Sequence, residues 1–320
     1  MKILIASSID RETMDALCRD HDVAAAINAD EAELSAAAVD REVIIFRSGV
    51  RVSSAVMAAA PRLRLLIRAG SGLDNVDIER ARTTGVRLLR VAGSSAQPVA
   101  ELTFALMLSV ARNVNRADAL LRLGHWPKSE LGGPLLHGRT LGVVGAGNIG
   151  SRVGEMGAAW GMRVLGCVAD PSSALAEQLG RRGIVMTGFD TVLEQSDFLS
   201  LHVPLDASTR HMISFDELKR MKEGAYLVNM ARGGVVDESA LLSELTGGGH
   251  LAGAALDVHE REGEGTLSLL GDLPSVVLTP HIGAMASDSQ RLIGLRVREL
   301  LEAYSDGTLD ATTTEAETVA

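Results

Sequence analysis

The stretch Thr140-Leu-Gly-Val-Val-Gly-Ala-Gly-Asn-Ile-Gly150 lies near the middle of the 320-residue chain and decides its fold. A short apolar run leads into the spacing Gly145-x-Gly147-x-x-Gly150, and a helix-like segment follows at residues 151–160. In a strand–turn–helix unit, Gly145 permits the tight turn, Gly147 lets the backbone approach a pyrophosphate, and Gly150 lets the helix pack closely on the strand. Because glycine accounts for 33 residues of the chain, the spacing alone is weak, and an ordinary strand–helix turn is the alternative. A second strand-like run after the helix favours a dinucleotide site.

The composition narrows the class of protein. Hydrophobic residues make up 46 % of the chain and aromatic residues only 3 %, which suits an aliphatic parallel sheet covered by helices. The net charge of −10, from 31 basic and 41 acidic residues, argues against nucleic-acid and anionic-membrane partners. No apolar run is long enough to span a bilayer, and the first six residues suit a strand better than a signal peptide. The two cysteines, Cys18 and Cys167, form no disulfide framework or metal-ligand spacing, so we expect a cytoplasmic protein.

Short apolar runs alternate with helix-like segments along the chain, which is typical of right-handed βαβ units and parallel sheets. In the first third, the strand-like runs are 2–7, 42–47, 63–69 and 86–91, and the helix-like segments are 11–19, 53–60 and 76–82. The later strand-like runs are 140–145, 163–168, 183–186, 197–203, 225–230, 253–258 and 276–279. The sequence therefore predicts an α/β protein with two Rossmann-like, doubly wound parallel-sheet domains and an interdomain cleft.

A long apolar, alanine-rich segment at residues 98–123 separates the two blocks, and Pro98 suits the start of a helix. We expect this helix to join the domains and, through its extra apolar surface, to support a homodimer. The predicted domains are a discontinuous substrate domain, 1–97 plus 285–304, and an NAD-binding domain, 98–284. The polar residues 305–320 are predicted to be a disordered tail.

Three polar side chains, Arg232, Glu262 and His281, follow strand-like runs of the second domain. Ligands of open α/β sheets bind beyond the carboxyl ends of the strands, so we expect all three near the nicotinamide end of a bound dinucleotide. Hydride transfer to a 2-oxo acid needs a cation that orients the carboxylate and a proton donor for the developing alkoxide. An imidazole can give and recover that proton, and a neighbouring carboxylate favours imidazolium and fixes the ring. Taken singly, each residue has a structural alternative, namely a surface arginine, a solvated acidic loop and a hydrogen-bonded histidine.

From residue 2 to about residue 304 the sequence resembles the D-isomer-specific 2-hydroxyacid dehydrogenase family. The segments that carry the resemblance are 68–77, 99–101, 140–150, 201–205, 229–238, 254–258 and 279–283. Together these segments are far more specific than the glycine spacing. The chain also departs from the family's pattern at four positions. Gly263 stands where proline is usual, His259 where an aromatic residue is usual, and Ser95 and Pro98 where asparagine and serine are common.

The resemblance implies that Arg232 binds the substrate carboxylate and carbonyl, that His281 is the general acid/base, and that Glu262 pairs with His281. It implies that backbone amides at Ser71 and Gly72 hold the carboxylate. The residues that it implies for NAD binding are Gly145, Gly147, Asn148, Ile149, Gly150, His202, Pro204, Ala231, Asp257 and Gly283, with Asp257 facing the nicotinamide amide group.

The acidic residue expected to bind the ribose of the cofactor is displaced in this chain. The family's usual aspartate aligns with Val168, whereas Asp170 lies twenty residues after Gly150, as the general rule requires. An acid at this place favours the free 2′-hydroxyl of NAD, and no arginine beside it could hold the 2′-phosphate of NADP. We therefore predict NAD as the cofactor and Asp170 as its ribose ligand.

Within the family, Ile44-Ile-Phe-Arg-Ser48 and residues 61–77 look most like phosphoglycerate dehydrogenases. Arg47 and Ser48 would then face the distal anionic end of a substrate such as 3-phosphoglycerate, although a plain surface arginine is the alternative. A shorter substrate such as glyoxylate, hydroxypyruvate or lactate is a second hypothesis. A third, from another class, is a binding protein that senses NAD(H) and recruits a partner as a corepressor does. A metal hydrolase lacks the necessary ligand spacing.

Overall fold

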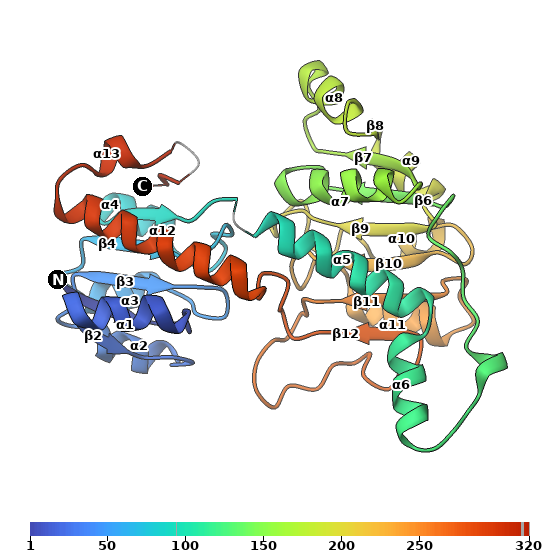
Figure 1. The fold of residues 1–320 in the computed structure, drawn as a ribbon, viewed down its shortest axis with the longest axis horizontal. Helices are drawn as coiled ribbons and strands as arrows, with labels where there is room; N and C mark the ends of the chain where they lie inside the picture. The colour runs from blue at the N-terminus through green and yellow to red at the C-terminus, as the bar shows by residue number, and fades with distance from the viewer. Residues whose placement is uncertain (94, 315–316, 320) are drawn as a thin grey trace. The chain divides into compact units, whose positions relative to one another are not determined.

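The computed structural model describes residues 1–93, 95–314 and 317–319. It divides into two compact units (Figure 1). Unit 1 consists of Met1–Ser95 with Ala284–Ala320, and unit 2 is Ala96–Gly283. Each unit is an α/β structure built on one parallel sheet, as the sequence predicts. Within the described residues, no helix combines the length and the hydropathy that crossing a membrane requires.

Unit 1 contains a five-stranded sheet in the order β2-β1-β3-β4-β5. Its strands are β1 (Lys2–Ile5), β2 (Asp22–Ala25), β3 (Val43–Phe46), β4 (Leu65–Arg68) and β5 (Arg87–Arg90). Its helices are α1 (Arg11–Asp20), α2 (Glu31–Ala38), α3 (Ser54–Ala59), α4 (Ile78–Thr84), α12 (Ser287–Ser305) and α13 (Leu309–Thr312). All strand pairs are parallel, and the order is one of the two common doubly wound ones.

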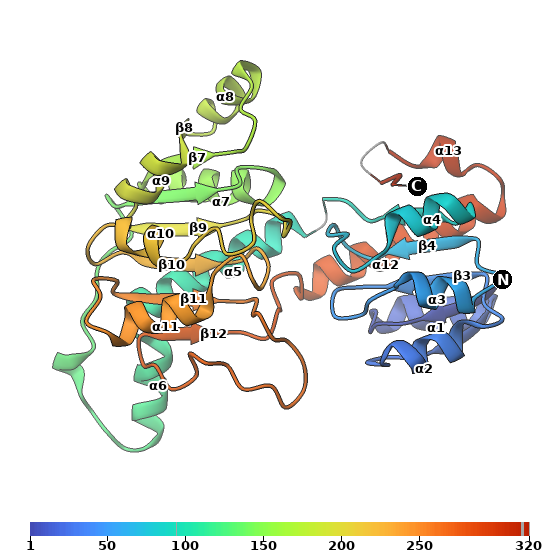
Figure 2. The same cartoon turned by 180° about the vertical axis from the view of Figure 1, so that it is seen from behind.

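Successive strand residues of unit 1 enter two separate cores, because side chains alternate across a sheet. Ile45 packs with apolar residues of α1 and α12, whereas Ile44 packs with those of α2, α3 and α4. Figure 1 shows α1 and α12 over one face of the sheet. Figure 2 shows α2, α3 and α4 over the opposite face. Burial on both faces explains why β3 consists entirely of apolar residues.

Unit 2 contains a seven-stranded parallel sheet in the order β12-β11-β10-β9-β6-β7-β8. Its strands are β6 (Thr140–Val144), β7 (Arg163–Cys167), β8 (Ile184–Met186), β9 (Phe198–Leu201), β10 (Tyr226–Asn229), β11 (Gly253–Leu256) and β12 (Val276–Leu278). Its helices are α5 (Ala96–Ala111), α6 (Val114–Arg122), α7 (Asn148–Ala159), α8 (Ser173–Gly180), α9 (Phe189–Gln195), α10 (Phe215–Arg220) and α11 (Glu238–Thr246), with a 3-10 turn at Lys128–Glu130. The strand order reverses between β6 and β9, and this switch point is where open α/β sheets bind ligands.

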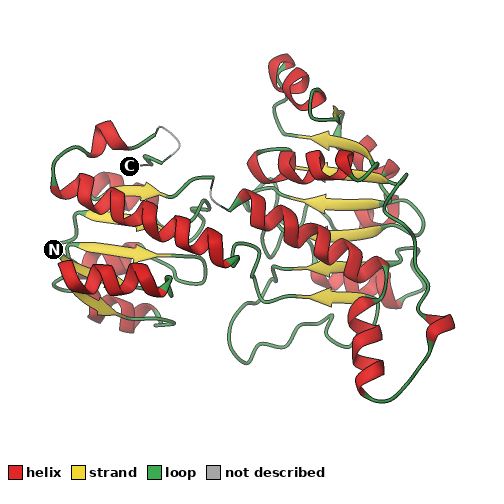
Figure 3. Ribbon diagram, in the orientation of Figure 1, coloured by secondary structure: helices red, strands yellow, loops and turns green. Residues whose placement is uncertain are grey.

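Helices cover both faces of the unit 2 sheet (Figure 3). Residues of α5 and α7 form one core with the sheet, and residues of α9, α10 and α11 form the other. All seven strands fall within the apolar runs predicted from the sequence. The inner strands are apolar because helices bury both of their faces, whereas the edge strand β8 leaves Val185 59 % exposed.

The single helix predicted for residues 98–123 is two helices in the structure. Helix α5 ends at Ala111, and α6 begins at Val114 after Asn113, whose backbone is left-handed at φ 53°. Asparagine tolerates this conformation better than most residues, and its side-chain amide donates to the Gly132 carbonyl at 3.1 Å. No proline or glycine interrupts the sequence there, so the left-handed turn at Asn113 accounts for the break between the two helices.

The prediction of a disordered tail at residues 305–320 is wrong for the part that the structure describes. Helix α13 buries Leu309, and Thr318 forms an antiparallel bridge with Leu89 of β5. The Glu317 carboxylate bonds to the Arg296 guanidinium at 2.8 Å, and this bond lowers the pKa of Glu317 to about 2. The polar composition of this segment gave no signal of an ordered structure. An ion pair and backbone hydrogen bonds to β5 hold the segment more than apolar packing does. Residues 315, 316 and 320 lie outside the described residues.

Candidate active site

The glycine loop after β6 has the backbone geometry that its three glycines require. Gly145 has φ 91°, and a Cβ there would lie 2.6 Å from the His202 carbonyl oxygen. A Cβ on Gly150 would lie 2.2 Å from the Gly145 carbonyl oxygen, so the turn and the first turn of α7 are in close contact. By contrast, no atom lies within 4 Å of the place that a Cβ on Gly147 would occupy. The loop is therefore closed on its protein side and open at Gly147.

This open side fits the phosphates of a dinucleotide. Helix α7 begins at Asn148, and its N-cap, Gly147, offers no side-chain hydrogen bond to the first turn. Both residues are exposed. The first backbone N–H groups of a helix lack intrahelical partners, and the helix dipole places partial positive charge at the same end. A pyrophosphate bound beside Gly147 would accept hydrogen bonds from Asn148, Ile149 and their neighbours.

Other predicted cofactor residues surround the same sheet edge. The backbone N–H of His202 donates to the Val144 carbonyl at 2.8 Å, which places the His202–Pro204 segment beside the glycine loop. Burial lowers the pKa of His202 to about 3, so its ring is neutral. The ring bonds to Ser200 through Nε2, while Nδ1 is buried without a hydrogen-bond partner among the described residues. Asp170 is exposed in the turn that follows β7.

An imidazole–carboxylate pair lies beyond the carboxyl ends of β11 and β12. Nδ1 of His281 is 2.9 Å from Oε2 of Glu262, and about a third or less of each side chain is exposed. Burial alone would raise the pKa of Glu262, but the His281 ring and the His259 backbone amide lower it, and the net shift is downward. Glu262 is therefore a carboxylate at neutral pH, and the ring is held through Nδ1 with Nε2 directed elsewhere.

Asp257 holds the turn that carries His281. Its carboxylate is almost completely buried and accepts hydrogen bonds from the Thr279 hydroxyl at 2.6 Å and from the amides of Ile282 and Gly283 at 2.8 Å. The Asp257 carbonyl accepts the His281 amide at 2.7 Å. His281 has φ 53°, a left-handed conformation that costs energy in a residue with a side chain. The Asp257 bonds maintain this turn, a role that sequence spacing did not reveal.

The third predicted residue, Arg232, lies in the loop after β10. Its Nη1 donates to the Ala231 carbonyl at 2.7 Å. The Asn229 side chain accepts a hydrogen bond from the Ala231 amide and donates one to the Arg232 carbonyl, each at 3.1 Å. A Cβ on Gly233 would lie 1.7 Å from the His259 carbonyl oxygen. The loop of Arg232 therefore packs directly against the segment that leads to Glu262, and the two belong to one sheet edge.

The predicted substrate-binding residues Arg47, Ser48, Ser71 and Gly72 belong to unit 1. Arg47 follows β3 and donates to the Ser8 carbonyl at 3.3 Å and to Sδ of Met285 at 3.4 Å. Burial lowers the pKa of the Arg47 guanidinium below its ordinary value. Its Nε is buried without a hydrogen-bond partner among the described residues, while Ser48 is exposed.

Two further residues support the substrate loop and were not anticipated. Arg68, the last residue of β4, is only 5 % exposed, and its Nε donates to the Asn75 side chain at 3.3 Å. The Asn75 amide in turn donates to the carbonyls of Arg47 and Val50. These bonds join the loop after β4, which contains Asn75, to the last residue of β4 and to the segment that follows β3. Arginines that directly end neighbouring strands are the signal that could have revealed this.

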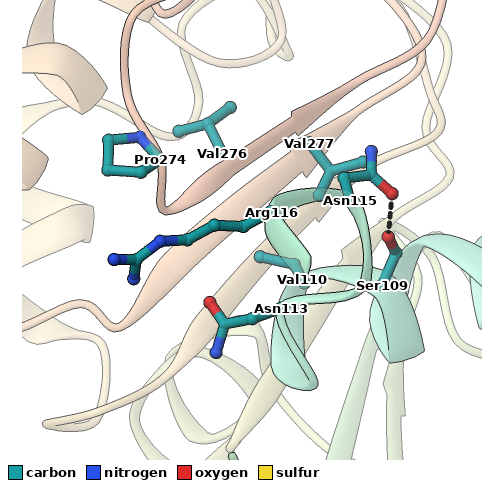
Figure 4. A pocket seen from close by; sticks show the side chains of 8 residues that line it. All are labelled: Ser109, Val110, Asn113, Asn115, Arg116, Pro274, Val276 and Val277. Carbon is teal, nitrogen blue, oxygen red and sulfur yellow. Dashed lines mark hydrogen bonds between the residues drawn. The ribbon is translucent and has the colours of Figure 1, made fainter. Parts of the chain in front are cut away.

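Unit 2 contains a hollow of about 230 Å³ (Figure 4). It is lined by Ser109, Val110, Asn113, Asn115, Arg116, Pro274, Val276 and Val277. Val276 is the first residue of β12, so the hollow opens near the amino end of that strand, opposite the end that leads to His281. Within the described part of the chain, no cluster of His, Cys, Asp or Glu has the arrangement that a metal ion needs.

Known proteins resemble the chain over most of its length. The model of the D-isomer specific 2-hydroxyacid dehydrogenase NAD binding domain matches residues 104–283. A hydroxypyruvate reductase from Thermotoga maritima is 41 % identical over 261 residues, which are 81 % of this chain and 83 % of that protein. A D-3-phosphoglycerate dehydrogenase from Methanocaldococcus jannaschii is 36 % identical over 309 residues, which are 97 % of this chain but 58 % of that protein. The chain thus spans little more than half the length of the second relative.

Solved structures agree with these relatives. The D-lactate dehydrogenase of Aquifex aeolicus, complexed with NAD and lactic acid, has a TM-score of 0.86 and 29 % identity, with 99 % of this chain and 98 % of that one covered. The family model and the relatives define the chain as an NAD-binding oxidoreductase. It belongs to the D-isomer specific 2-hydroxyacid dehydrogenase family. The resemblance read from the sequence motifs and the prediction of NAD are confirmed.

Proposed function

We propose that the chain interconverts a 2-oxo acid and a D-2-hydroxy acid, with His281 as acid/base, Glu262 as its partner and Arg232 as the cation that binds the carboxylate. The observation that carries this proposal is the 2.9 Å pair between Nδ1 of His281 and Oε2 of Glu262. The glycine loop belongs to unit 2, and the residues predicted to bind the substrate at Arg47, Ser48, Ser71 and Gly72 belong to unit 1. Oxidation of NADH by a panel of 2-oxo acids, followed at 340 nm, tests it.

The residues of the chain have distinct tasks in this reaction. NAD(H), when bound, supplies or accepts the hydride at the carbonyl carbon. Arg232 orients the substrate carboxylate with its guanidinium fork and polarises the carbonyl. Because Glu262 holds Nδ1 of His281, Nε2 is the atom that gives a proton to the carbonyl oxygen as its bond to carbon becomes single. Solvent returns the proton to the ring after reduction, and the same steps in reverse oxidise the hydroxy acid.

The substrate proposal is an acid with a second anionic group, such as 3-phosphoglycerate and its 2-oxo form. Arg47 supports it, because its guanidinium is partly desolvated and an anion would offset that cost. Replacing Arg47 with glutamine should raise KM for 3-phosphohydroxypyruvate roughly 10- to 100-fold, as expected for a lost charged hydrogen bond, and leave KM for glyoxylate nearly unchanged. Initial rates with both substrates measure the difference.

The matched control is Arg51→Gln, which removes an exposed arginine from the same loop and should affect neither substrate. Equal losses with both substrates in Arg47→Gln would remove the phosphate-site hypothesis.

The similarity to a hydroxypyruvate reductase favours the shorter 2-oxo acids as the second candidate. In that case hydroxypyruvate or glyoxylate would be the fastest substrate of the panel. Rapid NADH oxidation by any of them would reject a purely NAD(H)-sensing role.

We also propose that Asp170 accepts hydrogen bonds from the adenosine ribose of NAD. Its exposed position after β7 supports this, since the acid of the second strand lies there in dinucleotide-binding folds. Replacing Asp170 with alanine should raise KM for NADH about 10-fold, through loss of charge-assisted hydrogen bonds, and weaken discrimination against NADPH. The exposed Asp272 provides the control substitution. A wild-type preference for NADPH would show that Asp170 does not have this role.

A homodimer through the segment around α6 completes the proposal. Val114, Leu121, Leu123, Trp126 and Leu135 are each more than half exposed, which is unusual for large apolar residues so close in sequence. A second copy of the chain would bury them. Light scattering should therefore give twice the chain mass of 33.7 kDa, and Trp126→Glu should lower it toward the monomer value.

A further inference from the structure

Three neighbouring strands of unit 1 lead into arginine residues. Arg68 ends β4, Arg90 ends β5, and Arg47 directly follows β3. The parallel register places Phe46 beside Arg68 and Arg68 beside Arg90, so the three arginines come from one edge of the sheet. The loop that contains Ser71 and Gly72 leaves the sheet at this edge.

Two of these guanidinium groups bond to carbonyls of that loop. Nη1 of Arg68 donates to the Ala69 carbonyl, and Nη1 of Arg90 donates to the Ser71 carbonyl, both at 3.3 Å. Gly70 lies directly over Arg68, because a Cβ there would be 2.6 Å from Nη1. The Ser71 hydroxyl is also 3.2 Å from the hydroxyl of Ser95. The guanidinium groups of Arg68 and Arg90 therefore hold carbonyl groups of the loop in place.

The bond from Arg90 determines where the Gly72 amide points. A trans peptide is planar, so the carbonyl of Ser71 and the N–H of Gly72 point in opposite directions. A donor that holds the carbonyl on one side fixes the N–H on the other side. A charged donor also polarises the peptide, which strengthens the N–H as a hydrogen-bond donor.

We propose that Arg90 is a positioning residue that aims the Gly72 amide at the substrate carboxylate. The inference rests on the proposed function, which gives that amide to the carboxylate. Arg90 acts from behind the loop and does not itself need to touch the substrate. A merely structural arginine would affect stability, whereas this role predicts a selective loss of carboxylate binding.

The test compares Arg90→Met with the wild type and with the control Arg87→Met. Arg87 lies on the same strand and pairs with Asp310 of α13. In Arg90→Met, KM for the 2-oxo acid and Kd for oxalate, measured by calorimetry on the NADH-loaded enzyme, should each rise about tenfold, as for a weakened charged hydrogen bond. The kcat should change less than about threefold and Kd for NADH should not change, because His281 and the glycine loop are untouched. Arg87→Met should match the wild type in all four quantities.

Hydrogen exchange of the peptide 70–74 provides a measurement that needs neither ligand nor turnover. It should be faster in Arg90→Met than in the wild type and in Arg87→Met. Arg90→Gln keeps a neutral donor and should retain most oxalate binding, and it replaces Arg90→Met if the latter does not fold. Unchanged exchange and unchanged oxalate affinity would overturn the role of Arg90. If the wild type reduced no 2-oxo acid, the proposed function would be wrong. If hydrogen exchange of the loop still depended on Arg90 in that case, the role of Arg90 in fixing the loop would remain supported.

Discussion

Replacing His281 with alanine should lower kcat for 2-oxo acid reduction about 10²- to 10⁴-fold, the usual contribution of a positioned general acid. The His281 imidazole lies at this end of the sheet and can deliver a proton, and Glu262 lies 2.9 Å from its Nδ1. The affinity for NADH should not change, since the predicted cofactor contacts at the glycine loop lie on other segments. Stopped-flow turnover and NADH fluorescence titration measure the two effects separately.

His250→Ala is the matched control for this experiment. His250 also pairs with a carboxylate in unit 2, with Nδ1 3.2 Å from Oε1 of Glu244, but it follows α11 rather than a strand end. Its loss should leave kcat close to that of the wild type. Near-normal turnover of the His281 variant across the pH range would show that another group supplies the proton.

Replacing Arg232 with alanine should act mainly on substrate capture and reduce kcat/KM about 10²- to 10³-fold, as expected for two charged hydrogen bonds to a carboxylate. Most of this loss should appear as a higher KM, because the carboxylate is bound both before and during hydride transfer. Lysine at this position should restore little, since an ammonium group lacks the planar fork of guanidinium. Steady-state rates over a wide range of 2-oxo acid concentrations separate the two constants.

The exposed Arg182 offers a control, because its replacement removes the same charge from a helix end in unit 2. That variant should keep the wild-type KM. If Arg232→Ala changed only kcat, the guanidinium would be acting on the transition state alone and not on binding.

The sequence predicted the sheets well where strands are buried on both faces. The β6 and β9–β11 runs are apolar throughout or nearly so, and none was missed. In unit 1, β2 and α2 escaped notice. The strand is only partly buried and reads Asp-Val-Ala-Ala, and the helix is short and rich in alanine, so neither shows a clear hydrophobic period. Partial exposure weakens the pattern on which such predictions depend.

The residue types of the candidate site and its Glu262–His281 pair were predictable, but its other contacts were not. Strand-end placement brought Glu262 and His281 to attention, and their pairing followed from family resemblance. The three hydrogen bonds of Asp257 and the bond from Arg90 to Ser71 join positions far apart in the sequence. Such contacts depend on side-chain direction at the ends of different strands, which a linear pattern does not encode.

The short return of residues 317–319 to β5 affects how the protein can be handled. β5 is the outermost strand of its sheet, and its backbone bonds to this segment at Arg90 N–Glu317 O and Val319 N–Leu88 O. An uncovered outer strand is a template for pairing with other molecules. Truncation before Glu317 would leave these groups unpaired and invite aggregation during expression, so an affinity tag is better placed at the amino end.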